Sequence, residues 1–213
     1  MAIYKTNKFA LGICASFLVI GAAHATLVEQ DFATAGDGLL ILDTISNRQW
    51  VDVSHTTNMS VNQFFNSSIY AGKGFHLGTT ADITSFFLNA GAAAVNSNGG
   101  MNLLSASHNA AVLLNALMEH TSPYADSGGN QWIHGYENYG SGTNLTIARF
   151  IDTNGTATFD TGTNGTYWTY DSIHSAVGVF AWRDASSNVP EPASLALLGI
   201  GLVGLFGSRR KAK

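Results

Sequence analysis

The residues of this chain most suited to chemistry lie near its C-terminus. Four residues there precede an uncharged apolar run, 193–207: Val189, Pro190, Glu191 and Pro192. Proline cannot continue a helix and biases the residue before it towards an extended backbone, so this stretch presents an accessible main chain. Basic residues follow the run directly: Arg209, Arg210, Lys211 and Lys213. Apolar residues followed by positive charge are typical of a transmembrane helix whose basic end stays in the cytoplasm.

The order of these three elements resembles the PEP-CTERM sorting signal of Gram-negative bacteria over residues 189–213. The resemblance implies recognition by an exosortase, with processing near Pro190-Glu191-Pro192 and removal of the helix and basic tail. It also implies a protein associated with exopolysaccharide and the cell surface. The four motif residues would then be acted upon by another enzyme, and they would not be catalytic themselves.

The N-terminal end has the order of a secretory signal peptide. Lys5 and Lys8 precede an apolar run from Phe9 to about Gly21, and the small residues Ala23 and Ala25 follow. This order predicts cleavage after Ala25, with the Sec translocon and signal peptidase as partners. The alternative is an uncleaved membrane helix, although the run is short for a hydrocarbon core of about 30 Å.

Charge is distributed unevenly along the chain. Only 11% of the 213 residues are charged, and six of the ten basic residues lie at the two ends. Residues 26–208 hold four basic and fourteen acidic residues, a formal charge of −10. Clustered Lys and Arg are needed to neutralise phosphates, so a nucleic-acid partner is not expected.

Aromatic side chains in the second half suit carbohydrate, because their faces match the apolar CH faces of sugar rings. They alternate with Asn, Gly and Thr, whose polar groups suit sugar hydroxyls. The alternative is that the Trp residues belong to a sheet core and the Tyr residues form cross-strand pairs. The candidate glycan-binding residues are Trp132, Tyr136, Tyr139, Trp168 and Tyr170.

No pattern in the body predicts catalysis. Its six histidines lack metal-binding spacing, no Gly-x-Ser-x-Gly is present, and the single Cys lies in the signal peptide. Asp152-Thr153-Asn154-Gly155 and Asp160 with Asn164-Gly165 offer oxygen ligands for calcium, but hairpin turns use the same residues. We therefore expect a non-enzymatic domain with no metal and no cofactor.

The elements that position these residues are predicted as follows. Residues 39–43 and 48–53 are predicted to form a hairpin. Two helices are expected to begin directly after Ser60 and Thr80, and a third is expected from about residue 102 to residue 120. Strands are expected at 75–77, 131–136, 143–152, 156–160, 167–170 and 176–183, with Asn154-Gly155 as a hairpin turn. This order favours an α+β fold, an antiparallel sheet with two or three helices, flanked by a signal helix and a transmembrane helix.

The first half also resembles a recurrent extracellular domain of PEP-CTERM proteins, whose layout is similar to C-type-lectin-like domains. The expected organisation is a signal peptide at 1–25, an exported domain at 26–183, a linker at 184–188 and the sorting signal at 189–213. The residues that carry the resemblance are Asp43, Trp50, Asp52, Ser60, Gly74, Phe75, Gly78, Thr79, Ala90 and Gly91.

The two ends together predict an exported protein that passes through an inner-membrane intermediate to the cell surface or extracellular matrix. One alternative is a carbohydrate-binding module that uses the second-half aromatics. Another is an uncut periplasmic protein that stays anchored in the inner membrane by its C-terminal helix.

Overall fold

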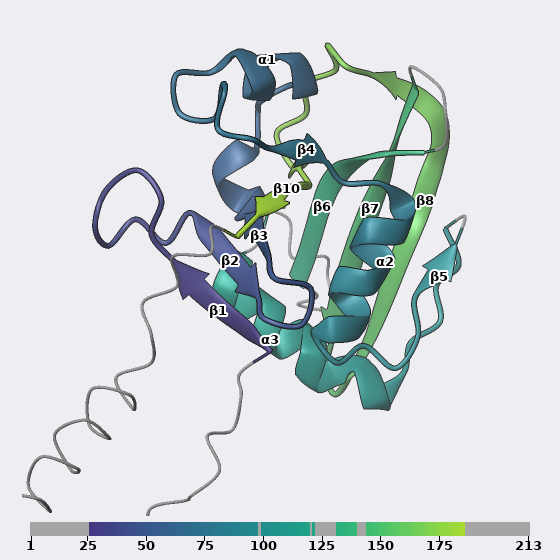
Figure 1. Ribbon diagram of the computed structural model, residues 1–213. Helices are drawn as coiled ribbons and strands as arrows, with labels where there is room; N and C mark the ends of the chain where they lie inside the picture. Colours follow the sequence, from purple (N-terminus) through teal and green to yellow (C-terminus); the bar gives the residue numbers. More distant parts are fainter. Residues whose placement is uncertain (1–25, 98, 120, 122–130, 140–143, 186–213) are drawn as a thin grey trace, which may run out of the picture.

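The computed structural model describes residues 26–97, 99–119, 121, 131–139 and 144–185 (Figure 1). The predicted signal peptide, transmembrane helix and sorting motif lie outside these residues. Among the helices described, none is long and apolar enough to cross a membrane.

The first sheet brings both ends of the described chain together. Its order is β1 (Leu27–Gln30), β2 (Leu40–Asp43), β3 (Arg48–Val51), β10 (Ala181–Asp184) and β4 (His76–Leu77), antiparallel throughout. The predicted hairpin is confirmed as β2 and β3. β1 was not predicted, because its sequence LVEQ shows no long apolar or alternating pattern.

The second sheet has the order β5 (Asn96–Ser97), β8 (Thr156–Thr169), β7 (Asn144–Thr153), β6 (Gln131–Asn138) and β9 (Gly178–Val179). β5 pairs with β8 and β9 pairs with β6 in parallel, whereas the other pairs are antiparallel. The predicted α+β class with few helices is therefore confirmed, but the expectation of a single antiparallel sheet was wrong, because there are two sheets and the second is mixed. The hairpin at Asn154-Gly155 is confirmed, but 156–160 and 167–170 are not separate strands, because β8 runs through the residues between them.

The first and third helices are shorter than their sequence patterns predict, whereas the second has the expected length. They are η1 (Val53–Thr56), α1 (Val61–Asn66), α2 (Thr80–Asn89), η2 (Ser105–Ser107) and α3 (His108–Met118). The helix expected from 102 begins only at His108, after the η2 turn. Ser60 forms a full capping box with Gln63, as does Thr79 with Asp82, so Thr79 rather than Thr80 caps α2.

Two apolar cores fill the domain. α2 and α3 cover one face of the second sheet (Figure 1), where Phe87 meets Phe150 and Phe159 at ring-centroid distances of 6.0 and 5.0 Å. The opposite face of β6 and β7 packs with α1 and the first sheet, and Phe64 and Tyr136 are fully buried there. The first sheet contributes to both cores, because side chains alternate across a strand.

The last predicted strand, 176–183, divides between the two sheets. β9 pairs with β6 and β10 pairs with β3 and β4, while Phe180 between them is fully buried. Gly178 makes this route possible, because a Cβ there would collide with the carbonyl oxygen of Val53. The final strands therefore join the two sheets into one unit.

Candidate functional site

The last described residues of the domain lie close in sequence to the predicted sorting motif. β10 extends to Asp184, one residue into the segment expected to be a linker, and the Ala185 amide donates to the Asn47 carbonyl at 3.0 Å. Pro190 follows five residues after Ala185. Five residues span at most about 18 Å, so an enzyme acting at Pro190 works close to the edge of the domain.

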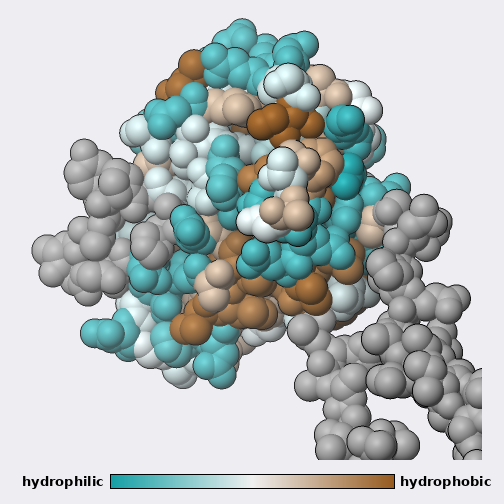
Figure 2. Space-filling view, turned by 90° about the vertical axis from the view of Figure 1, so that its left-hand side faces the viewer, coloured by the Kyte–Doolittle hydropathy of each residue, from teal (hydrophilic) through white to brown (hydrophobic). Residues whose placement is uncertain are grey.

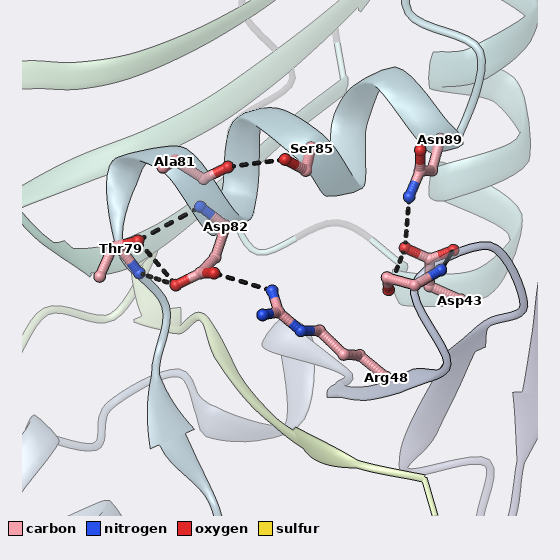
Figure 3. A network of polar contacts seen from close by, with 8 residues as sticks. Asp43, Arg48, Thr79, Ala81, Asp82, Ser85 and Asn89 are labelled. Atoms are coloured by element: carbon pink, nitrogen blue, oxygen red, sulfur yellow. Dashed lines mark hydrogen bonds and ion pairs between the residues drawn. The ribbon is translucent and has the colours of Figure 1, made fainter.

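Two residues of the extracellular-domain pattern, Asp43 and Thr79, take part in polar contacts between the β2–β3 hairpin and α2 (Figure 3). The Asp43 carboxylate accepts from the Ile45 and Ser46 amides in the hairpin turn and from Asn89 Nδ2 at 2.8 Å. At the other end of α2, Arg48 donates to Asp82 at 2.7 Å. This network fixes the helix against the hairpin, which gives Asp43 a structural role.

Other residues of the same pattern also serve the fold. Trp50 is fully buried and stacks on Phe86 with ring centroids 4.7 Å apart. Asp52 caps η1 by accepting from the Ser54 amide at 2.9 Å. Burial raises the pKa of Asp52 to about 6, and the hydrogen bond from Ser54 only partly opposes this effect. The pattern is thus a pattern of folding constraints.

The five candidate glycan-binding aromatics do not form one site. Tyr136 is fully buried, so it is core, and its ring packs 5.7 Å from that of Trp168. Trp132 lies near the other end of the same sheet, stacked on His134 at 5.4 Å with the Arg149 guanidinium 5.7 Å from its ring. Trp132 and Trp168 pair with β7 residues six positions apart, a separation of about 20 Å along the strand. Tyr139 is exposed beyond the end of β6.

Tyr170 does line a hollow that could take a small ligand. The hollow has a volume of about 490 Å³ and is lined by Asn62, Thr169, Tyr170 and Asp171. Asn62 Nδ2 donates to the Asp171 carboxylate at 2.7 Å, and the Asn62 amide donates to the Tyr170 carbonyl at 3.0 Å. Amide, hydroxyl and carboxylate groups beside an aromatic ring match the polar edges and apolar faces of a sugar.

Asn62 and Asp171 were not among the predicted site residues. Asn62 lies in the first turn of α1 and Asp171 follows β8, so only the tertiary fold brings them together. No local sequence pattern links residues so far apart, so their proximity could not be predicted from the sequence.

The acidic turns considered for calcium hold their carboxylates against basic side chains. Asp152 contacts His108 Nδ1 at 2.8 Å beside a polar hollow of about 280 Å³. Asp160 is fully buried, forms an ion pair with Arg149 at 3.3 Å and accepts from the Thr163 hydroxyl at 2.5 Å. Both carboxylates are thus engaged within the protein.

One buried carboxylate is incompletely paired. Glu137 is fully buried in β6, where its Oε1 accepts from the Thr146 hydroxyl and the Gly162 amide and its Oε2 has no partner among the described residues. Burial raises the pKa of Glu137, and the hydrogen bond from Gly162 opposes that shift. With no exposed surface, this carboxyl is placed to hold the sheet rather than to meet a substrate.

Comparison with known families addresses the C-terminal region. Residues 188–211 match the family model of the PEP-CTERM protein-sorting motif. The C-terminus is a PEP-CTERM sorting signal. This signal makes the chain an exported protein that transits the membrane, with an exosortase as its processing partner.

The PEP-CTERM match does not extend to the folded domain. No curated protein and no solved structure shows significant similarity to the chain. The likeness to C-type-lectin-like domains stays a prediction, and the role of the domain has to be argued from its own surface.

Proposed function

We propose that this chain is a non-enzymatic component of the cell surface or extracellular matrix that associates with exopolysaccharide after exosortase processing. The observation that supports this proposal is the position of the sorting signal directly after a folded domain. Both described sheets and both described cores lie within residues 26–185, so cleavage near the Pro-Glu-Pro motif removes none of their described residues. A released product would keep its fold.

Fractionation of cells that carry an exosortase tests this proposal. We expect the wild-type protein in the surface and medium fractions, and a double variant Pro190→Ala/Glu191→Ala in the inner-membrane fraction. A variant with Ser187→Ala is the matched control, because it changes a residue close to the motif without altering it, and it should behave as wild type. Wild-type protein found only in the inner membrane would instead support the uncut, anchored alternative.

A carbohydrate-binding module is the second candidate function, and the Tyr170 hollow favours it. Its lining combines an aromatic ring with amide and carboxylate groups that are already oriented by the contact between Asn62 and Asp171. A glycan array with wild type and Tyr170→Ala tests the idea, with the exposed Tyr139 changed to Ala as control. Loss of glycan binding in Tyr170→Ala alone is expected; equal binding by all three proteins contradicts a role for this hollow.

A further inference from the structure

The domain holds only four Lys and Arg residues, and two of them share one place on its surface. Arg48 pairs with Asp82 and Arg149 with Asp160. Among the residues that the structure describes, Lys73 and Arg183 form no ion pair. In a body with a formal charge of −10, unneutralised cations that lie together need an explanation.

Arg183 is held ready to bind an anion. Its Nε donates to Gln49 Oε1 at 2.8 Å, and its guanidinium lies 4.6 Å from the Phe32 ring centroid and 5.1 Å from that of Phe75. The aromatic contacts and the Gln49 bond fix the plane of the guanidinium, while its terminal nitrogens donate to no other described residue. A guanidinium held in this orientation can donate two parallel hydrogen bonds to a carboxylate, and it loses little side-chain entropy on binding because it is already fixed.

Lys73 reaches the same place from a tight loop. Gly72 and Gly74 on either side of it have φ angles of 68° and 78°, a backbone that residues other than glycine rarely adopt. The Lys73 amide donates to the Tyr70 carbonyl at 3.2 Å, which closes the turn and leaves the side chain exposed.

Two hollows meet at these cations, and we call them together the Lys73–Arg183 groove. One, of about 540 Å³, is lined by Lys73, Gly74, His76, Arg183 and Asp184. The other, of about 460 Å³, is lined by Phe32, Ala33, Ser68, Ile69, Lys73 and Arg183. Because both cations line both hollows, an extended ligand could occupy the two and place its charge at their junction.

The groove lies between the loop after β1 and the loop after α1. Both loops are on the left of Figure 1, and this side faces the viewer in Figure 2, where apolar and hydrophilic residues are interleaved. A surface of this mixed kind suits a sugar chain, which offers apolar ring faces as well as charged and hydroxyl groups.

Nearby acids limit the charge that the groove can accept. Asp184 lines one hollow, and Asp37 lies in the loop after β1, where its carboxylate accepts from the Phe32, Ala33 and Thr34 amides. Two cations with acids close by favour a ligand with widely spaced single charges over a dense polyanion such as a nucleic acid.

We propose that the Lys73–Arg183 groove binds an acidic polysaccharide, with a sugar carboxylate held by the Arg183 fork and Lys73. This proposal rests on the exopolysaccharide association proposed above and names the chemical class of the glycan and the surface that takes it.

Calorimetric titration of the exported protein with polygalacturonate tests the proposal, with dextran as a neutral polymer and single-stranded DNA as a dense polyanion. We expect binding to polygalacturonate that weakens with added salt, and much weaker binding to the other two. Arg183→Gln and Lys73→Ala should each reduce affinity about tenfold or more, because each removes a charged hydrogen-bond donor.

Two further variants keep the result interpretable. Lys73 is exposed, so Lys73→Ala should fold normally, and Lys73→Arg should restore binding because it restores the charge. Val112→Ala changes an exposed residue of α3 that lines neither hollow of the groove, and it should leave polygalacturonate binding unchanged. Wild-type protein that ignores polygalacturonate, that binds dextran equally well, or whose binding survives both cation substitutions overturns the proposal. Surface delivery in the fractionation experiment would still stand in that case, so the two failures are distinguishable.

Discussion

Asp52 makes the stability of the domain depend on pH in a way that can be measured. The residue is only 3% exposed where β3 meets η1, and burial raises its pKa from 3.8 to about 6. The folded state therefore holds a proton that the unfolded chain releases at lower pH. The contribution of Asp52 to stability is fully present below about pH 4 and is lost as the pH rises through about 6.

The size of this effect follows from the two pKa values. A pKa of about 6 in the folded state against 3.8 in the unfolded chain corresponds to about 3 kcal/mol of unfolding free energy at pH 7. Asp52→Asn removes the titration and leaves a side-chain oxygen that can still accept from the Ser54 amide. We therefore expect the unfolding free energy of the variant, relative to wild type, to rise by about 3 kcal/mol between pH 4 and pH 7.

Urea unfolding of the exported domain at several pH values measures this difference directly. Comparing the variant with wild type at each pH cancels the titration of groups that do not interact with Asp52. Asp37 provides a control, because its pKa is shifted in the opposite direction from that of Asp52. Burial raises the pKa of Asp37, but hydrogen bonds from the backbone amides of Thr34, Phe32, Ala33 and Leu39 outweigh this effect and lower it to about 2. A difference between Asp52→Asn and wild type that stays flat from pH 4 to 7 would refute the argument.

Three further predictions concern the fold. Gly178→Ala should lower the unfolding free energy by about 3 kcal/mol or more, because the new methyl group would collide with the Val53 carbonyl oxygen. Gly155→Ala places its methyl group where no atom lies within 4 Å, so it should lower the unfolding free energy by only about 1 kcal/mol, the cost of a φ of 83°. Thermal unfolding of both variants measures the two effects. Burial, assisted by the charge of Arg149, lowers the pKa of His134 to about 4, so its contribution to stability is present above pH 6.5 and is lost as the pH falls through 4. His134→Gln should remove about 3 kcal/mol of the pH dependence of the unfolding free energy, measured by acid titration. If the pH dependence is the same in the variant and the wild type, the burial of His134 is contradicted. Arg48→Gln should cost about 1 kcal/mol at low salt, and a cost that does not shrink in high salt would show that the ion pair with α2 contributes nothing.

Much of the fold could be predicted because the deciding signals are local. Turn residues at 44–47 and Asn154-Gly155 identify two hairpins, and the apolar spacing of Ile83, Phe86 and Phe87 identifies α2. The division of 176–183 could not be predicted, because an uninterrupted apolar run does not reveal which sheet each half joins. That choice depends on how closely Gly178 approaches η1.

The candidate sites differ in the same way. The sorting signal is a continuous segment whose chemistry depends on its order, so the sequence alone was sufficient to recognise it. The Tyr170 hollow and the Lys73–Arg183 groove each join residues about a hundred positions apart, and only β10 and the end of β8 bring them together. Tyr136, which looked like a ligand-binding aromatic, is core because it packs in a buried cluster with residues of α1 and the first sheet, such as Phe64 and Val51.

Intact-mass spectrometry of the protein released at the surface tests the central claim most directly. In cells with an exosortase, the mass should correspond to a chain that lacks residues 1–25 and the segment after about Pro192. In cells without the enzyme, the C-terminal segment should remain. A surface protein that keeps residues 193–213 in the presence of the exosortase would contradict the account.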